Sequence, residues 1–304
     1  MRIHHVFANR SNVGDWLSAR GIQQLLREAH PDLAIREHLV DEPFVAGTVA
    51  ALSAAHPDDL IVIGGGGLFM DYFEPFWVAF EPLSLRRPFA IWGVGLVDLK
   101  AEQSLPSRDL VAAIVSRARL AVVRDELTRR FVDLPLPPAV PCPSLAAVPV
   151  ASAGRGLLHV NNYTTVGAPV YDAMRRTGRR WATATDRVYR ETNNRIEPGR
   201  EDQLGEILRR YALSDIVVSS ALHGCVIAVA MGRPVVAVSG DRKIEAFMEA
   251  ADLSEWVVDT TEAARIAAML GRIDEQPFAT AFVEQAVQAN RDVARRMVAA
   301  LSPA

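Results

Sequence analysis

Cysteine is scarce in this chain of 304 residues, which holds only Cys142 and Cys225. Cys142 falls in a proline-rich stretch and Cys225 in an apolar, helix-like run, so the two form no C-x-x-C pair. This distribution argues against a disulfide framework and against a cysteine zinc site, and it is typical of a reducing cytoplasm. The histidine, cysteine and acidic residues also show no metal-ligand spacing, and the sequence therefore predicts no metal site.

Long hydrophobic runs and basic tracts are absent as well. No stretch reaches the roughly 18 uninterrupted apolar residues of a membrane helix, and the N-terminus lacks the apolar region of a signal peptide. The formal net charge is only −3. We therefore expect a cytoplasmic protein without a transmembrane segment, and neither nucleic acid nor an anionic membrane surface is expected as a partner.

Short apolar runs alternate with helix-like stretches, which is the pattern of a doubly wound α/β fold. In the first half we expect strands at 3–8, 33–40, 59–65, 88–96 and 120–125, and helices at 15–30, 45–56 and 107–118. The strand at 59–65 is continuously apolar, as in a parallel sheet that is covered on both faces.

A proline-rich stretch at 133–156 then interrupts the pattern and predicts a linker, because proline at this density does not build regular structure. Beyond it we expect strands at 156–163, 215–220, 234–240 and 255–259, and helices at 201–213, 223–232 and 242–251. The chain closes with one or two helices between 277 and 301.

These elements predict two Rossmann-like doubly wound domains, 1–150 and 151–276, with the closing helix (277–301) packing back on the first. Two such domains leave a cleft between the carboxyl ends of their strands, where open α/β sheets bind ligands.

Polar residues follow two strands of the first domain. "NVGD", residues 12–15, supplies a helix cap, a tight turn and a carboxylate through Asn12, Gly14 and Asp15, with ordinary capping as the alternative. "VRD" places Arg124 at a strand end, where a guanidinium can hold a carboxylate or phosphate with two hydrogen bonds. The alternative there is a surface ion pair with Asp125.

Four consecutive glycines, residues 64–67, follow the apolar strand. They lack the G-x-G-x-x-G spacing of a dinucleotide site and the lysine of a Walker loop. Gly65, Gly66 and Gly67 can still bring backbone N–H groups close to an anion, or the run can serve only the close packing of strand and helix.

The stretch "SSALHGCVIAVAMG", residues 219–232, is the most informative of the second domain. A buried strand ends in Ser219 and Ser220, and His223 and Gly224 then begin an apolar helix. In this architecture His223 faces the cleft, where it can act as an acid, a base or a phosphate ligand; a buried structural histidine is the alternative.

Two further positions carry weaker signals. The stretch "NNYTT", from Asn161 to Thr165, ends the first strand of the second domain and lines the cleft or belongs to loop structure. Arg242 and Lys243 open a helix and either reach an anion or form a solvated face.

In this order, "NVGD", "GGGGLF", "VRD" and "SSALHG" resemble the motifs of the polysaccharide pyruvyl transferase family, from residue 12 to about residue 253. "DRKIEAFMEAADL" also looks like the family's lysine-containing helix. The resemblance implies two Rossmann-like domains that face a cleft, as in GT-B glycosyltransferases. It also implies transfer of the enolpyruvyl group of phosphoenolpyruvate to hydroxyls of a glycan, or of a lipid-linked or nucleotide-linked sugar, with formation of a ketal and release of phosphate. Phosphoenolpyruvate is then a co-substrate, and no cofactor or metal is required.

The resemblance also assigns roles. The catalytic acid/base candidates are His223 and Asp15. The donor-binding residues that it implies are Arg124, Ser219, Ser220, Leu222, Gly224 and Lys243. The residues that it implies for the cleft and the acceptor are Asn12, Gly14, Gly65, Gly66, Gly67 and Asn161.

One position departs from the family pattern: some members carry arginine just before the Leu-His pair, where this chain has Ala221. Arg242, Lys243 or Arg195 would then replace that guanidinium, or the donor differs. Two other functions stay open, namely a GT-B glycosyltransferase that uses a nucleotide sugar, and a non-catalytic binding protein of the same fold. The sequence indicates neither the acceptor sugar nor the oligomeric state.

Overall fold

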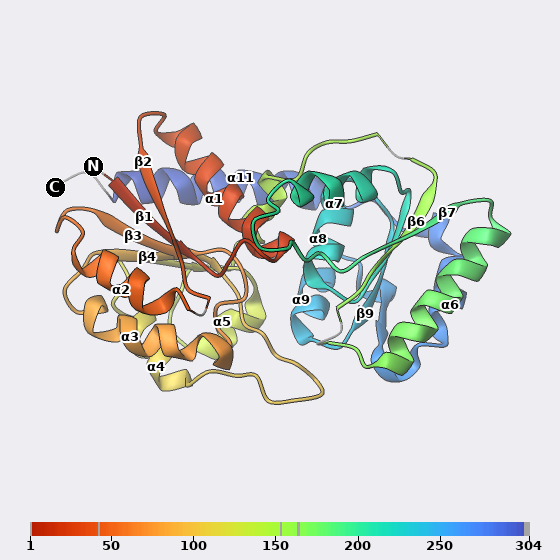
Figure 1. Cartoon of the computed structure of the whole chain (residues 1–304), viewed down its shortest axis with the longest axis horizontal. Helices are drawn as coiled ribbons and strands as arrows, with labels where there is room; N and C mark the ends of the chain where they lie inside the picture. The colour runs from red at the N-terminus through yellow and green to blue at the C-terminus, as the bar shows by residue number, and fades with distance from the viewer. Residues whose placement is uncertain (1, 42, 153, 163–164, 301–304) are drawn as a thin grey trace.

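The computed structural model describes residues 2–41, 43–152, 154–162 and 165–300. Each half of the chain forms one parallel five-stranded sheet flanked by helices, and the two sheets lie toward opposite ends of the molecule (Figure 1). The predicted fold class, two doubly wound α/β units, is confirmed. We call them the first unit and the second unit.

The first unit has the strand order β2-β1-β3-β4-β5. Its strands are β1 (Arg2–Phe7), β2 (Ala34–Leu39), β3 (Leu60–Gly64), β4 (Phe89–Val94) and β5 (Leu120–Val123). Its helices are α1 (Val13–Ala29), α2 (Val45–Ser53), α3 (Glu74–Ser84), α4 (Arg108–Val115) and α5 (Glu126–Val132), with a 3-10 turn η1 (Asp71–Phe73). All residues of β3 and β4 are buried, as expected for central strands of a sheet covered on both faces.

The second unit has the strand order β10-β9-β8-β6-β7. Its strands are β6 (Gly156–Val160), β7 (Val188–Thr192), β8 (Ile216–Ser219), β9 (Val235–Ser239) and β10 (Val257–Asp259). Its helices are α6 (Ala168–Ala184), α7 (Gln203–Ala212), α8 (Leu222–Ala230), α9 (Arg242–Ala250) and α10 (Arg265–Gly271), with 3-10 turns η3 (Ser254–Trp256), η4 (Thr260–Glu262) and η5 (Ile273–Glu275). The sequence pattern did not indicate β7, because a half-exposed edge strand lacks a continuous apolar run.

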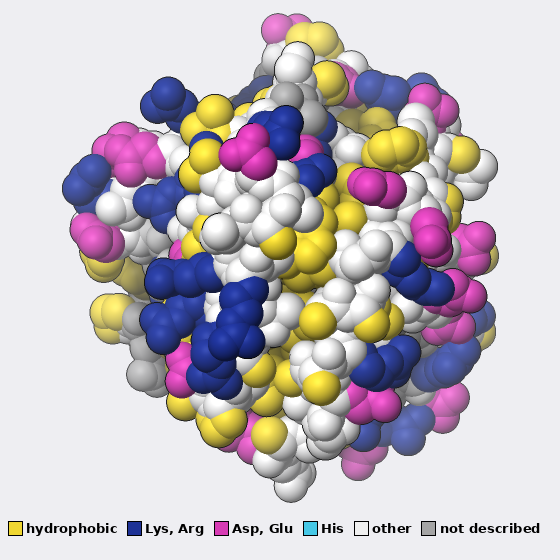
Figure 2. Space-filling model, turned by 90° about the vertical axis from the view of Figure 1, so that its right-hand side faces the viewer, with side chains coloured by type: hydrophobic (Ala, Val, Ile, Leu, Met, Phe, Trp, Pro, Cys, Tyr) yellow, Lys and Arg dark blue, Asp and Glu magenta, His cyan; other side chains and the backbone are white. Residues whose placement is uncertain are grey.

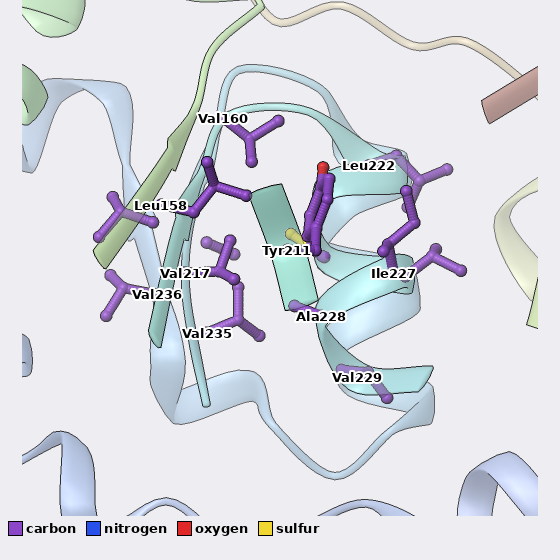
Figure 3. Packing of buried hydrophobic residues seen from close by; sticks show 14 of the residues in the cluster. Leu158, Val160, Tyr211, Val217, Leu222, Ile227, Ala228, Val229, Val235 and Val236 are labelled. Atoms are coloured by element: carbon purple, nitrogen blue, oxygen red, sulfur yellow. The ribbon is translucent and has the colours of Figure 1, made fainter. Parts of the chain in front are cut away.

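Tyr211 of α7 lies in the middle of the second unit's core, among aliphatic side chains of the sheet and of α8 (Figure 3). It is fully buried, and its hydroxyl group is hydrogen-bonded to the side chain of Asn194 at 2.8 Å. A buried phenol needs such a partner. The bond anchors the loop that follows β7 to the core.

The chain closes with a single long helix, α11 (Thr280–Ala299). Ala286, near its start, packs in the core of the second unit, whereas Val293 and Met297 pack in the core of the first. Between them, Asn290 accepts a hydrogen bond from Trp92 Nε1 at 2.9 Å and donates one to the carbonyl of Pro141 at 2.8 Å. The helix therefore contacts both units.

The proline-rich stretch contains a buried 3-10 turn, η2 (Pro143–Ala146), where the sequence predicted only an irregular linker. The turn packs closely against α1, because a side chain at Gly21 would overlap the Pro143 carbonyl. Proline is well suited to the start of a helical turn, and the next two residues of the turn, Ser144 and Leu145, are buried. The segment thus packs against α1 as well as connecting the two units.

Lysine and arginine side chains gather on the outer face of the second unit (Figure 2). Three arginines of this unit lie over aromatic rings, with distances of 5.5 Å for Arg175 and Tyr171, 5.1 Å for Arg179 and Tyr189, and 4.9 Å for Arg187 and Trp181. None of these three lines the cleft described below.

Across the described part of the chain, no helix combines the length and the apolar character needed to cross a membrane.

Candidate functional site

A cleft of ≈ 200 Å³ opens where the carboxyl ends of the two sheets face each other. The first unit lines it with Asn12, Asp15, Gly67, Met70, Phe73, Val97, Leu99 and Arg124. The second unit lines it with Asn162, Thr165, Asn193, Asn194, Arg195, Ala221, Leu222, His223 and Lys243. The sequence-predicted residues that meet there are Asn12, Asp15, Gly67, Arg124, Leu222, His223 and Lys243.

Two antiparallel β-bridges join the units at the border of this cleft. One pairs Asn12 with Arg195, and the other pairs Leu99 with Asp241. The first is extended by a hydrogen bond of 3.0 Å from the Val13 N–H to the Asn194 carbonyl. Backbone pairing on this scale holds residues from distant parts of the chain in a defined relative position.

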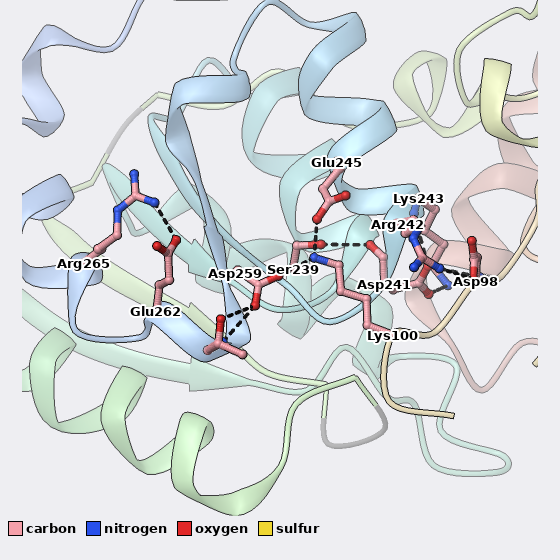
Figure 4. Close-up of polar contacts among 11 residues, drawn as sticks. Asp98, Lys100, Ser239, Asp241, Arg242, Lys243, Glu245, Asp259, Glu262 and Arg265 are labelled. Atoms are coloured by element: carbon pink, nitrogen blue, oxygen red, sulfur yellow. Dashed lines mark hydrogen bonds and ion pairs between the residues drawn. The ribbon is translucent and has the colours of Figure 1, made fainter. Parts of the chain in front are cut away.

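Charged side chains reinforce the second bridge (Figure 4). Lys100 Nζ lies 2.6 Å from Asp259 and also pairs with Glu245, while Arg242 Nη1 donates to Asp98 Oδ1 at 2.8 Å. Arg242 is thereby held at the second β-bridge. It does not line the cleft, so it does not take the place of the arginine that the family pattern has at Ala221.

The N-terminus of α1 contributes Asn12 and Asp15 to the cleft. Asn12 is its N-cap, and the Asn12 side chain accepts a hydrogen bond from the Gly14 N–H at 2.8 Å. Asp15 follows in the first turn and lines the cleft. The predicted capping role and the cleft position therefore coexist in the same turn.

The glycine run serves to bring the backbone against α1. Gly65 and Gly66 have positive φ angles of 81° and 88°, which side chains rarely adopt. A Cβ at Gly66 would overlap the Asp15 carboxylate, and one at Gly65 would lie 2.8 Å from Ser18 Cβ. Gly67 lines the cleft, and its N–H donates to the Asp15 carboxylate. Of the two alternatives left open by the sequence, close packing thus accounts for Gly65 and Gly66.

Asp15 is a carboxyl group with a raised pKa. Burial raises the pKa of Asp15 to about 6, although the positive charges of Lys243 and Arg124 and the Gly67 N–H act in the opposite direction. A carboxyl group that titrates near neutral pH can hold a proton and release it, which suits an acid catalyst.

His223, at the start of α8, faces Asp15's helix across the cleft. Its Nε2 atom lies 3.4 Å from Ser18 Oγ and 3.5 Å from Cys142 Sγ. Gly14 packs directly on the ring, because a Cβ there would lie 2.6 Å from Cε1 and closer still to Nδ1. Burial and the nearby charges of Arg124 and Lys243 hold the pKa of His223 well below its usual value, so the imidazole is neutral at pH 7.

Arg124 has an unused hydrogen-bond donor. The side chain is only 5% exposed, and its Nε donates to Asp125 Oδ2 at 3.2 Å. The buried Nη2 atom has no hydrogen-bond partner among the described residues. A buried guanidinium without a full set of acceptors is costly, and an anion bound in the cleft would supply the missing acceptor.

Lys243 and Arg195 complete the positive side of the cleft. Lys243 Nζ lies 2.6 Å from the fully buried Asp241, whose carboxylate also accepts from the Lys243 N–H at 3.2 Å and so caps α9. With Arg124 they make three cations at the cleft, although Arg124 and Lys243 are paired with Asp125 and Asp241, which do not line it. The charge of Arg195 and the unused Nη2 donor of Arg124 favour an anionic ligand.

Four predicted donor or cleft residues lie behind the wall of the cleft. Ser219 Oγ donates to the Ala221 carbonyl at 2.8 Å, and Ser220 Oγ accepts from the Asn162 N–H at 2.9 Å. Gly224 packs on Ser219 Oγ, and Asn161 is buried beneath its loop. The two hydroxyls are therefore engaged with backbone groups, in contrast to the donor-binding role that the resemblance implies for them.

Asn162 and Thr165, which belong to the stretch 161–165 that the sequence indicated, line the cleft together with Asn193 and Asn194, which the sequence did not indicate. They follow β6 and β7, and the second of these strands was not predicted. The segment "NNR", residues 193–195, was the available signal, because an asparagine pair followed by arginine marks a polar turn.

A second cavity of ≈ 420 Å³ adjoins the cleft and shares Arg124, Leu222 and Lys243 with it. It lies among α5, α8, α9 and α11, with the rings of Phe247 and Phe282 on its apolar side and several carboxylates at its edge. The two spaces therefore meet at a shared wall that carries two cations.

Histidine, cysteine and acidic side chains form no group of three that could hold a metal ion, within the part of the chain described. The arrangement offers instead cations and N–H donors for an anion, a carboxyl group that titrates near neutral pH, and a neutral imidazole. These groups suit proton transfer to and from a bound anionic substrate.

A protein-family model described as polysaccharide pyruvyl transferase matches residues 12–242 of this chain. Among solved structures, the UDP-GlcNAc 2-epimerase of Neisseria meningitidis is similar, with a TM-score of 0.62 and 10% identity over 98% of this chain and 99% of that one. The epimerase of Methanocaldococcus jannaschii is similar with a TM-score of 0.61 and 9% identity over 99% of each chain. The search of curated proteins found no match. At these identities the structural neighbours establish the GT-B-like fold alone.

Proposed function

Because the chain belongs to the polysaccharide pyruvyl transferase family, we propose that it transfers the enolpyruvyl group of phosphoenolpyruvate to two hydroxyls of a sugar. The product is a pyruvate ketal, and phosphate is released. The observation that carries this proposal is the buried Nη2 atom of Arg124, which has no acceptor among the residues that the structure describes. Arg124 lines the cleft together with Lys243 and Arg195.

Phosphoenolpyruvate carries a carboxylate and a phosphate, so its binding requires several positive charges and N–H donors. Arg124 would contact one of these anions through Nη2, and Lys243 and Arg195 would contact the other. Lys243 and Arg195 both line the cleft with Ala221, so either can supply the charge that an arginine at that position gives some family members.

The first chemical step needs a proton on the methylene carbon of the donor. Asp15 in its protonated form would transfer that proton to C3, which becomes a methyl group, and positive charge develops at C2. An acceptor hydroxyl then attacks C2 and its proton passes to the Asp15 carboxylate. The raised pKa of Asp15 fits a group that must give and regain a proton near neutral pH.

The second step closes the ketal. A neighbouring hydroxyl of the same sugar attacks C2, the bond between C2 and the phosphate oxygen breaks, and the hydroxyl proton leaves with the phosphate. Arg124 and Lys243 would stabilise the departing charge, and the acceptor sugar would enter through the cavity that shares these two residues with the cleft.

Ligand-induced stabilisation tests this proposal. Phosphoenolpyruvate should raise the melting temperature, whereas UDP and GDP at equal concentration should not, because a ligand stabilises only the protein that binds it. Phosphate release from phosphoenolpyruvate in the presence of candidate glycans then tests turnover. Stabilisation by UDP alone would favour the nucleotide-sugar transferase, and stabilisation by none of the three would favour a non-catalytic binding protein.

A further inference from the structure

Three buried side chains lie in contact behind His223. Ser144 Oγ donates to Cys142 Sγ at 3.1 Å, and Ser18 Oγ also lies 3.1 Å from Cys142 Sγ. Both Ser18 Oγ and Cys142 Sγ approach His223 Nε2, at 3.4 and 3.5 Å. All three side chains are at most 1% exposed. They come from α1 and from the proline-rich segment, so the contact exists only in the folded chain.

The number of protons decides the direction of these hydrogen bonds. The two hydroxyls and the thiol carry one proton each, and the Ser144 proton already points to Cys142 Sγ. If His223 Nε2 accepts, both the Ser18 proton and the Cys142 proton have acceptors. One of these two residues donates to Nε2, and the second residue donates to the first. If Nε2 carried a proton, either the Ser18 proton or the Cys142 proton would face no acceptor within this cluster. The first arrangement leaves no buried donor unused.

The surroundings keep this imidazole uncharged. Arg124 and Lys243 repel a second proton on the ring, and burial adds to their effect, so the pKa of His223 lies well below its usual value. A neutral imidazole carries one proton, and the hydrogen bond at one nitrogen determines which nitrogen holds it.

We propose that Ser144, Cys142 and Ser18 form a directional hydrogen-bond relay that ends on His223 Nε2 and places the single imidazole proton on Nδ1. His223 lines the cleft, and Nδ1 has no hydrogen-bond partner among the described residues. The neutral ring therefore donates Nδ1–H to an anionic oxygen of the bound donor. This step rests on the proposed function, whereas the tautomer itself does not.

The relay determines which of His223 and Asp15 can transfer a proton in the cleft. A neutral imidazole with its proton on Nδ1 is a hydrogen-bond donor toward the ligand and cannot serve there as a base. Proton transfer then falls to Asp15. Ser18 and Cys142 are positioning residues, because they act through His223 and touch no ligand themselves.

Nitrogen-15 NMR of the labelled full-length protein at pH 7.5 reads the tautomer directly. The His223 signals are identified by their loss in His223→Asn. We expect a protonated Nδ1 and an unprotonated Nε2 in the wild type. A protonated Nε2 in the wild-type spectrum would overturn the proposal, whatever the behaviour of any variant.

A pair of double variants tests the relay. Ser18→Ala with Cys142→Ala removes both donors to Nε2, and we expect a mixture of tautomers and a fall of about tenfold or more in affinity for phosphoenolpyruvate. Ser18→Ala with Cys142→Ser restores one donor and should restore the wild-type spectrum and affinity. Cys225→Ala removes the other buried thiol, which does not contact His223, and should change neither.

The outcomes of these experiments test the relay and the proposed function separately. If the wild type shows the Nδ1–H tautomer but phosphoenolpyruvate neither binds nor stabilises the protein, the relay stands and the proposed function fails. If phosphoenolpyruvate binds and both double variants keep the wild-type tautomer and affinity, the relay fails and the proposed function stands.

Discussion

The contact between Gly14 and His223 allows the role of His223 to be tested without changing that residue. Gly14→Ala adds one methyl group in the first turn of α1, where alanine is otherwise the better helix former by about 1 kcal/mol. The added Cβ would lie 2.6 Å from His223 Cε1 and closer to Nδ1. Carbon atoms in comfortable contact lie about 3.5–4.0 Å apart, so the ring must recede by about 1 Å.

Two neighbouring side chains limit the movement of the ring. Its far edge already touches Ser18 Oγ at 3.4 Å and Cys142 Sγ at 3.5 Å. A displacement of about 1 Å at a catalytic group can cost about 100-fold in rate. Overpacking costs about 1–3 kcal/mol, partly offset by the helix gain, so the net loss of stability should be about 0–2 kcal/mol.

The assay is phosphate release from phosphoenolpyruvate with a glycan acceptor, together with the melting temperature. Gly47→Ala and Gly205→Ala are matched controls, because both glycines lie in the first turn of a helix and an added Cβ would meet nothing within 4 Å. They should keep full activity and be slightly stabilised. Gly14→Ala with wild-type turnover would refute the view that the position of His223 matters for the reaction.

Other predictions concern charge and pH. Asp15→Asn should lose turnover but keep binding of phosphoenolpyruvate, and wild-type kcat/KM should fall about tenfold per pH unit above the Asp15 pKa of about 6, because the acid must be protonated. Lys243→Met removes a cation that lowers that pKa, so the decline should begin at higher pH, and an unchanged profile would contradict the assignment. Arg124→Lys should weaken binding of phosphoenolpyruvate by about 10-fold to 100-fold through loss of its planar donor pair, whereas equal affinity would show that Nη2 does not bind the donor. Burial lowers the pKa of His5 and of His38 to about 4 in the folded protein. As the pH falls below about 6.5, these histidines therefore bind protons in the unfolded chain before they do so in the folded one. The stability present above that pH should decline toward pH 4, by about 2 kcal/mol at pH 5 for the fully buried His5, and urea unfolding of His5→Gln should show a shallower decline.

The sequence predicted the main elements of the fold because central parallel strands are continuously apolar and helices repeat their apolar residues at a fixed period. It gave no helix for α3, α6 or α10, and it failed at β7, a half-exposed edge strand, and at η2, where prolines suggested an irregular linker. The failures at β7 and η2 have one cause: a local pattern does not reveal which segments a distant element covers. The loop after β7 and the buried Cys142 were missed or misjudged for the same reason.

Turn motifs indicated the ends of strands that face the cleft, and Asp15, Arg124 and His223 were named on that basis. The direction of each side chain was beyond the reach of the motifs. Ser219 and Ser220 follow the same strand as His223, yet their hydroxyls bond to backbone groups behind the wall. Hydroxyls at a strand end can serve backbone or ligand equally well, and the neighbouring loops decide between them.

The sequence by itself determined the two α/β units, the glycine-rich approach to α1 and the types of residue at the strand ends. The tertiary structure alone decided the chemistry of these residues. Burial raises the pKa of Asp15 against the opposing charges of Lys243 and Arg124, and the tautomer that we propose for His223 depends on Ser18 and Cys142. Desolvation and charge act over a few ångströms in space, and only the folded chain brings groups more than 100 positions apart within that range.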